Sequence, residues 1–251
     1  MTIQQVSIRA LPNFYPDTQD VYTVTVTGFE RYFRGATKIK TVVTKDAATV
    51  DHWIQQIYSD YKDSLDCCAK NENSWARHRF IVALDVEWKP AAHDNQAPIA
   101  ILKLCVGSRW YSARCLVFQI SRCYQLPKSL HRFLEDDNLG FVGLDIESVA
   151  RKLETEFNLD VKRAVDLKDL VAENYPQKKK EVKTLDLMGL AKMVFRSKEI
   201  ERPRDVIVSN WNQKYLTQPQ IMYAVVDAYV TFKIGDELNY THQYSTPSVL
   251  D

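Results

Sequence analysis

The stretch FIVALDVEWKP, residues 80–90, begins as an apolar run of strand-forming residues and ends with two acids, Asp85 and Glu87, beside a tryptophan. Residues two apart in a strand point to the same face, with Cα atoms roughly 6.5 Å apart. Both carboxylates therefore lie on one face of the predicted strand. Like charges this close raise each other's pKa unless a cation lies between them. Taken alone, the stretch is equally typical of a strand end that binds a cation and of a solvated strand terminus.

A third acid lies near the C-terminus in almost wholly apolar surroundings. Asp227 belongs to YAVVDAYVTF, within a helix predicted over 217–238, and an unpaired carboxylate there is costly. Tyr223 lies four residues earlier and shares its helical face. Oxygen ligands without histidine or thiolate favour Mg²⁺ or Mn²⁺ over zinc. We therefore predict that Asp85, Glu87 and Asp227 converge on a divalent ion.

The order of the predicted elements indicates the fold class. Apolar and β-branched runs between polar turns predict strands at 22–26, 40–44, 80–86, 99–106, 115–120 and 141–145. Helical spacing of apolar residues predicts helices at 47–63, 127–136, 146–157, 166–174, 184–195 and 217–238. This order is typical of an α/β fold with a mixed sheet flanked by helices. We predict a single domain over 21–240, after an irregular lead-in at 1–20 and before a C-terminal tail at 241–251.

Composition indicates the expected location of the protein more than its function. The chain has 251 residues, 45% hydrophobic and 26% charged, with a formal net charge of +1, so no global field indicates a polyanionic partner. No apolar run approaches the roughly 18 residues of a membrane span. The N-terminus lacks a basic start followed by an apolar block. We expect an intracellular protein, nuclear or cytoplasmic, with no membrane partner and reduced cysteines.

Four stretches occur in an order that resembles a known family. They are VALDVEWKP, IAILKLCV, FVGLDIESVARKLETEFN and SNWNQKYLTQPQIMYAVVDAYVTF. Together they resemble the Werner-type 3'-5' exonuclease domain, in the ribonuclease D branch of the DnaQ-like superfamily. The resemblance implies a ribonuclease H-like fold, two Mg²⁺ or Mn²⁺ ions and stepwise hydrolysis of nucleic acid from the 3' end.

The resemblance also implies roles for individual residues. Asp85 and Glu87 match the first motif of the family. Tyr223 and Asp227 match the last motif, in which the tyrosine orients the attacking water. The second motif reads roughly V-G-x-G-I-x-G-D-x-x-K-L in relatives, and aligning FVGLDIESVARKL with it puts Val149 at the metal-binding aspartate. Valine offers no lone pair, so one ion site is expected and the second is in doubt.

The consequence of this departure depends on its neighbours. Asp145, four residues before Val149, would share its face and act as a replacement metal ligand if the helix extended that far back. Ile146, Val149 and Leu153 also form an apolar stripe, so the helix is equally interpreted as more buried. Lys103 stands where relatives usually have glutamine. It is interpreted first as a surface lysine, and alternatively as an ammonium that replaces part of the metal charge.

Nucleic acid, DNA or RNA, is the predicted partner, with contacts at two places. Trp88 follows the acids and offers a ring for base stacking, although packing is the commoner use of tryptophan. Lys178, Lys179 and Lys180 form a basic run, with Arg202 among the basic residues further on. Such runs are usually only solvated, and phosphate contact is the alternative.

Two functions remain open from the sequence. The first is a metal-dependent 3'-5' exonuclease that is weakened at its second metal site. Losing that ion would cost several kcal/mol of leaving-group stabilisation, which is about three or more decades in rate. The second is a non-catalytic protein on the same fold that binds nucleic acid or a protein partner, such as an active paralogue. Val149 favours weak or absent cleavage.

Overall fold

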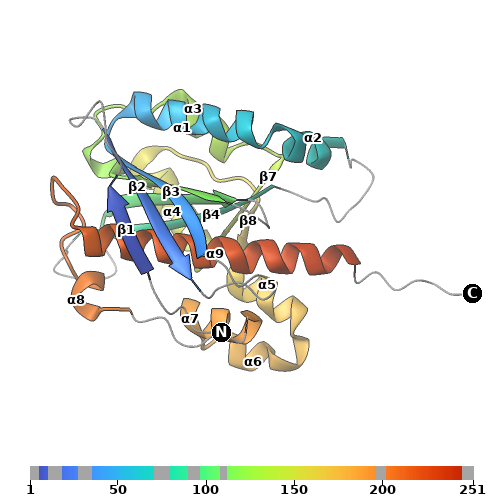
Figure 1. Ribbon diagram of the computed structural model, residues 1–251. Coiled ribbons are helices and arrows are strands. Elements are labelled where there is room, and N and C mark those ends of the chain that lie inside the picture. The colour runs from blue at the N-terminus through green and yellow to red at the C-terminus, as the bar shows by residue number, and fades with distance from the viewer. Residues whose placement is uncertain are drawn as a thin grey trace, which may run out of the picture.

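An eight-stranded mixed sheet forms the centre of the computed structural model (Figure 1). The structure describes residues 6–10, 19–27, 36–70, 80–89, 97–107, 112–195 and 202–244. The strands are β1 (Val6–Ala10), β2 (Gln19–Thr27), β3 (Ala36–Thr44), β4 (Phe80–Trp88), β5 (Ile99–Gly107), β6 (Ala113–Phe118), β7 (Leu139–Gly143) and β8 (Ala164–Asp166). Their order across the sheet is β1-β2-β3-β6-β5-β4-β7-β8. The predicted α/β fold with a mixed sheet is confirmed.

Helices cover both faces of this sheet. They are α1 (Ala47–Asp60), α2 (Lys62–Lys70), α3 (Lys128–Leu134), α4 (Ile146–Phe157), α5 (Leu167–Asn174), α6 (Lys179–Val182), α7 (Leu187–Phe195), α8 (Arg204–Ile207) and α9 (Gln218–Tyr244), with 3₁₀ turns η2 (Ile120–Arg122) and η3 (Pro176–Lys178). Figure 1 shows α1 and α3 on one side of the sheet, and α9 with α5 to α7 on the other. Within the described ranges, no helix is both long and apolar enough to cross a membrane.

The three central strands are buried on both faces. All nine residues of β5 are buried, as expected for a nearly continuous apolar strand between two helical layers. β5 pairs antiparallel with β4 and β6, whereas β4 pairs parallel with β7. In the β4–β5 register, Asp85 lies directly opposite Lys103. The fold therefore places a lysine beside the acidic strand end, inside the core.

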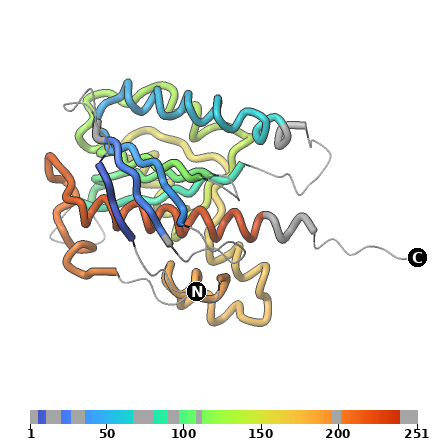
Figure 2. Tube along the Cα trace, viewed as in Figure 1, coloured from blue at the N-terminus to red at the C-terminus, as the bar shows by residue number. Residues whose placement is uncertain are grey.

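Helix α9 carries the third acid underneath the sheet. It contacts every strand from β1 to β7, and Figure 2 shows it crossing the whole sheet. Most of its residues from Ile221 to Leu238 are buried, because the sheet covers one side and α5 and α7 pack against another. A helix buried nearly all round has no polar face. Asp227 therefore needs a partner from within the protein.

A network around Gln220 fixes the segment that precedes α9. The Thr217 backbone N–H donates to Gln220 Oε1 at 2.9 Å, and the Gln220 N–H donates to Thr217 Oγ1 at 3.4 Å, which forms a capping box. The Gln220 amide also donates to Ser209 Oγ at 2.9 Å and to the Asn210 carbonyl at 3.2 Å. These bonds hold the 208–217 segment, which includes Trp211, against the start of α9.

The structure corrects three details of the predicted organisation. Residues 6–10 form an edge strand where an irregular lead-in over 1–20 was predicted, because the partly buried Val6 and Ile8 alternate with exposed residues and pair with β2. The helix predicted over 47–63 ends at Asp60, and α2 follows it as a separate helix. Helix α9 continues to Tyr244, into the predicted tail at 241–251. The rest of that tail lies outside the described residues.

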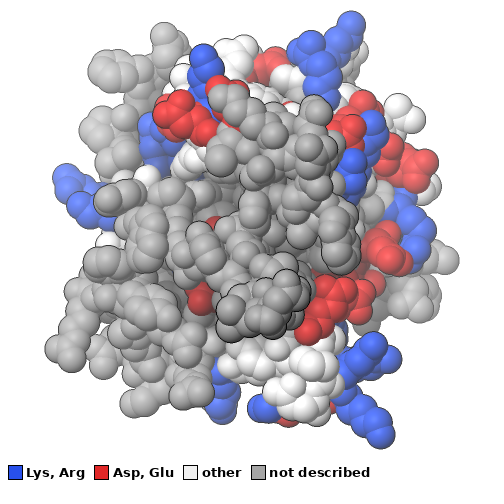
Figure 3. Space-filling model, turned by 90° about the vertical axis from the view of Figure 1, so that its right-hand side faces the viewer, with Lys and Arg blue, Asp and Glu red and all other residues white. Residues whose placement is uncertain are grey.

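Charges of both signs are interspersed on the described part of the surface. Figure 3 shows this for one face, where Lys and Arg side chains lie next to Asp and Glu side chains. This mixture agrees with the net charge of +1. On this face, the described residues form no large area of one sign that would attract nucleic acid from a distance.

Gly143 permits the close approach of β7 to β4. An added Cβ would lie 2.4 Å from the Leu84 backbone oxygen, which cannot move without shifting β4. We therefore expect Gly143→Ala to destabilise the fold by about 1–3 kcal/mol, as overpacking typically does. Gly189→Ala is the matched control, because its Cβ would meet chiefly the Leu185 side chain. Urea unfolding of both variants checks this, and equal midpoints for the two would contradict it.

Candidate functional site

A cleft of about 640 Å³ lies between the end of β4, the 207–211 segment and the first turns of α9. Five residues singled out from the sequence line it together: Asp85, Glu87, Trp88, Tyr223 and Asp227. Lys89, Arg202, Ile207, Val208 and Trp211 are among its other lining residues. Residues from widely separated parts of the chain thus meet at one place, as the acid pattern predicted.

The side chain of Lys103 fills the space between the first two acids. Its Nζ lies 2.6 Å from Asp85 Oδ2 and 2.5 Å from Glu87 Oε1, and it donates a hydrogen bond to the latter. Lys103 is 0% exposed. The expectation of a surface lysine is therefore wrong, and the alternative of an ammonium near the carboxylates describes the structure. Its position follows from the antiparallel register, which places it opposite Asp85.

The charges of this cluster depend on one another. Burial alone would lower the pKa of Lys103, but Asp85, Glu87 and Asp227 hold it well above its ordinary value. Burial raises the pKa of the Glu87 carboxyl to about 7, against the lowering effect of Lys103. The ammonium is therefore protonated throughout the physiological range.

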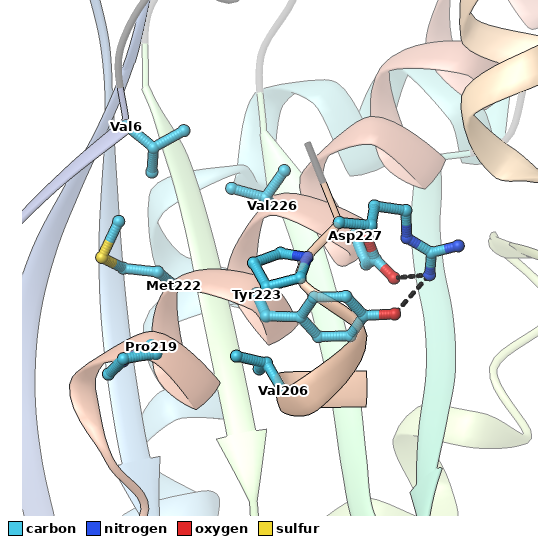
Figure 4. Close-up of a pocket in the computed structure, with 9 residues that line it drawn as sticks. Val6, Val206, Pro219, Met222, Tyr223, Val226 and Asp227 are labelled. Atoms are coloured by element: carbon cyan, nitrogen blue, oxygen red, sulfur yellow. Dashed lines mark hydrogen bonds and ion pairs between the residues drawn. The ribbon is translucent and has the colours of Figure 1, made fainter. Parts of the chain in front are cut away.

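A second cation holds the acid on α9. Arg202 Nη2 lies 2.6 Å from Asp227 Oδ2 and also donates to the Tyr223 hydroxyl (Figure 4). Its Nη1 lies 3.9 Å from Asp186 Oδ2. Burial raises the pKa of the Asp227 carboxyl, while Lys103 and Arg202 lower it. Arg202 is thus the partner that the apolar surroundings of Asp227 require.

Tyr223 is a core residue and a site residue at once. Its ring is tilted by 46° against the Trp211 ring at a centroid distance of 5.9 Å. The Arg202 guanidinium carbon lies 5.2 Å from the Tyr223 ring centroid. Burial raises the pKa of the Tyr223 phenol above its ordinary value. The phenol is therefore neutral, and its oxygen accepts a hydrogen bond from arginine.

An apolar pocket of about 210 Å³ lies behind this group (Figure 4). Its apolar lining comes from β1, α8 and α9: Val6, Pro203, Val206, Pro219, Met222 and Val226. Arg202, Tyr223 and Asp227 line both this pocket and the cleft. These three side chains therefore form the wall between the two cavities.

A divalent ion does not fit this arrangement. Mg²⁺ and Mn²⁺ need free carboxylate oxygens, whereas Lys103 contacts both acids of β4 and Arg202 contacts Asp227. Among the described residues, no group of three or more His, Cys, Asp or Glu side chains is arranged to hold a metal. The prediction of a single Mg²⁺ or Mn²⁺ site therefore disagrees with the geometry, because side-chain cations lie beside the oxygens that would bind the ion.

A sequence model of the 3'-5' exonuclease family matches residues 55–241, which include the whole cleft. The chain belongs to the 3'-5' exonuclease family. It is 31% identical over 159 residues to a bifunctional 3'-5' exonuclease/ATP-dependent helicase of Mus musculus, covering 63% of this chain and 11% of that protein. It is 30% identical over 157 residues to a 3'-5' exonuclease of Arabidopsis thaliana, covering 61% of this chain and 50% of that protein. The chain thus spans half or less of the length of these curated relatives.

Among solved structures, this member of the exonuclease family is similar to the EXD2 exonuclease domain soaked in Mg and dGMP. The TM-score is 0.43 at 22% identity, and the match covers 84% of this chain and 97% of that chain. The exonuclease family match agrees with the ribonuclease H-like fold that the sequence motifs implied.

The second-motif position lies in the core of this family member. Val149 is 6% exposed and packs with Ile146 and Leu153 in the cluster that also contains Val86. Asp145 is exposed, has a left-handed backbone (φ 48°, ψ 38°), and is not among the lining residues of the cleft. Helix α4 begins at Ile146, so it does not extend back to carry Asp145 on the face of Val149.

The basic run lies apart from the cleft. Lys178, Lys179 and Lys180 are exposed on η3 and α6. Lys178 lines a different groove, with Tyr175 and Gly189, and its Nζ lies 3.7 Å from a carboxylate oxygen of Glu181. None of the three lysines is among the cleft's lining residues. Any contact that they make with nucleic acid is therefore separate from the carboxylate site.

Sequence reasoning missed the role of Arg202 and ranked Lys103 wrongly. Two signals were available. A lysine in the middle of IAILKLCV, a run apolar enough to be buried on both faces, needs a carboxylate partner. An isolated acid in an apolar helix needs a cation, but nothing in the sequence distinguishes Arg202 from the neighbouring basic residues as that cation. Arg202 is brought to Asp227 by the tertiary fold alone.

Removing the ammonium leaves the buried Glu87 and the partly buried Asp85 without their shared cation. We expect Lys103→Met to lower the free energy of unfolding by about 3–5 kcal/mol, as for other broken buried ion pairs. The double variant Glu87→Gln with Lys103→Met also loses one carboxylate charge and is expected to recover part of that loss. Lys128→Met, at an exposed position, is the control. Denaturant unfolding measures all of them, and equal stability of Lys103→Met and Lys128→Met would contradict the pairing.

Proposed function

We propose that this chain binds nucleic acid in the cleft of an exonuclease fold and hydrolyses it weakly or not at all. The observation that carries the proposal is the position of Lys103, whose ammonium lies 2.6 Å and 2.5 Å from the two carboxylates of β4. The whole-protein activities of the longer relatives are not part of this proposal. Its site of action is intracellular, nuclear or cytoplasmic.

The chemistry of the family explains why cleavage suffers. In two-metal hydrolysis one ion activates the attacking water and the other stabilises the leaving oxygen. By resemblance, Asp85, Glu87 and Asp227 would hold the first ion, but Lys103 and Arg202 contact these acids. An ammonium carries one positive charge and cannot bind a hydroxide as a metal does. The second ion lacks an acid at position 149.

Tyr223 shares its hydroxyl with a cation. A tyrosine hydroxyl has one proton to donate and two lone pairs that accept, so it would orient a water only beside the Arg202 guanidinium. Here the Tyr223 hydroxyl accepts a hydrogen bond from Arg202, which also bonds Asp227. The contacts of Lys103 and Arg202 with these carboxylates, together with the valine at position 149, support a loss of about three or more decades in rate.

Trp88 and Lys89, which line the cleft, suit a nucleobase and its phosphate. Trp88 is 37% exposed, and the Lys152 ammonium lies 5.3 Å from its ring centroid. Exposed aromatic rings in nucleic-acid clefts stack on bases and add about 1–3 kcal/mol per base. Lys89 lines the cleft next to Trp88 and offers a positive charge for a phosphate. Because Lys103 and Arg202 offset the carboxylates, these acids repel a bound phosphate less.

The exposed run Lys178, Lys179 and Lys180 is proposed as a second, non-specific phosphate contact. It is supported by the exposure of the three side chains. Contacts of this kind strengthen binding regardless of sequence and weaken with salt. Replacing all three by glutamine should therefore weaken binding of any oligonucleotide and reduce its salt dependence.

Cleavage and binding are separable in one experiment. A labelled single strand and a 3'-recessed duplex are incubated with the protein in Mg²⁺, in Mn²⁺ and in EDTA. We expect retention of the oligonucleotide in all three conditions and no shortening beyond a trace, because binding does not use an ion. Shortening that requires Mn²⁺ and disappears in Asp85→Ala would contradict the proposal. Neither binding nor shortening would also contradict it, and would favour a protein partner.

Trp88 gives the most direct test of the binding site. We expect Trp88→Ala to weaken binding of a single-stranded oligonucleotide by about 1–3 kcal/mol, or roughly 5- to 150-fold in Kd. Tyr124→Ala is the matched control, because Tyr124 is a fully exposed aromatic residue away from the cleft lining. Fluorescence anisotropy measures both affinities. Equal losses in the two variants would place the bound strand elsewhere.

A further inference from the structure

We infer that Lys103 is a built-in substitute for a metal ion, and that this one side chain keeps a divalent-cation site closed. The inference concerns the same cleft as the proposed function, but it does not depend on nucleic-acid binding. It starts from the disagreement between the family's use of ions and the cation-filled site of this chain.

The Lys103 ammonium lies against both carboxylates of β4. Lys103 bridges Asp85 and Glu87, with Nζ at 2.6 Å and 2.5 Å from one oxygen of each, and it lies directly opposite Asp85 in the sheet. Two carboxylates on one face of a strand need a cation between them. The ammonium is in the place where a single cation offsets both charges.

The protein core encloses the Lys103 side chain. Lys103 is 0% exposed and extends from β5, whose residues are all buried. An ammonium on such a strand cannot turn out into solvent to make room for an ion. A metal ion from solution would therefore have to displace the Lys103 ammonium, which is attached to the chain and cannot move into solvent.

Lys103 closes the site more effectively than Arg202. Arg202 has a side chain that is 26% exposed and contacts a single acid of the trio, Asp227. It lines the cleft, and part of its side chain is exposed. Lys103 contacts two acids and has no such exposure. Removal of Lys103 alone is therefore expected to free the two β4 carboxylates for an ion.

The ligands left after that removal have the right chemistry. Asp85 and Glu87 supply hard oxygens on one strand, and Asp227 lies near enough to raise the pKa of Glu87. Such carboxylates favour Mg²⁺ and Mn²⁺. Glutamine at position 103 is neutral and one atom shorter than lysine, so it leaves the two carboxylates without a cation.

The test measures the thermal stability of four proteins with and without Mn²⁺. They are the wild type, Lys103→Gln, Lys128→Gln as the exposed control, and the double variant Glu87→Gln with Lys103→Gln. At a hundredfold excess of Mn²⁺ over Kd, we expect the Tm of Lys103→Gln to rise by about 5–10 °C. The wild type and Lys128→Gln should shift by less than about 1 °C, because no site is open. The electron paramagnetic resonance signal of free Mn²⁺ counts the ions bound.

The double variant keeps the test decisive if Lys103→Gln folds poorly. With one carboxylate neutralised it is expected to fold without an ion and to bind Mn²⁺ at least about tenfold more weakly than Lys103→Gln. If Lys103→Gln unfolds in EDTA and folds in Mn²⁺, the inference is supported. If the wild type binds Mn²⁺ as tightly as Lys103→Gln, or if Lys103→Gln folds and binds none, the inference is overturned. No oligonucleotide is present, so the result is independent of the proposed function.

Discussion

The contact of one ammonium with two carboxylates, at the centre of the sheet, is the interaction on which the rest of this structure depends. Lys103 lies 2.6 Å from Asp85 and 2.5 Å from Glu87 without any exposure to solvent. Without this pairing, a charged group in the protein interior would be very costly. The pairing therefore sets the charge states of these side chains. It also stabilises the β4–β5 register that places Lys103 opposite Asp85.

Three features of the site are consistent with one another. Position 149 is a buried valine, Lys103 is a cation beside Asp85 and Glu87, and Arg202 pairs with Asp227. If all are ionised, three carboxylates face two monovalent cations, which leaves one net negative charge. Burial raises the pKa of the Glu87 carboxyl to about 7, and Lys89 adds a further positive charge to the lining of the cleft. Side-chain cations therefore offset the carboxylates of the cleft.

The sequence predicted the architecture well because periodicity and burial carry that information. The alternating and continuous apolar runs located the central strands, and the apolar surroundings of Asp227 correctly indicated that it needs a partner. The acids of β4 and α9 were predicted to meet, and they line one cleft. The edge strand at 6–10 was missed because its five residues carry only two partly buried apolar side chains.

The identity of the cations was beyond the reach of pattern alone. A carboxylate in an apolar segment demands a positive charge, but a metal ion, a lysine and an arginine all satisfy it. The choice depends on register for Lys103 and on the path of the chain before α8 for Arg202. Both are tertiary properties.

The most direct test is an anomalous diffraction experiment on wild-type crystals soaked in Mn²⁺. The account predicts no manganese peak among Asp85, Glu87 and Asp227, with continuous density for the Lys103 side chain between the two β4 carboxylates. A manganese peak coordinated by these acids, with Lys103 displaced from them, would contradict it.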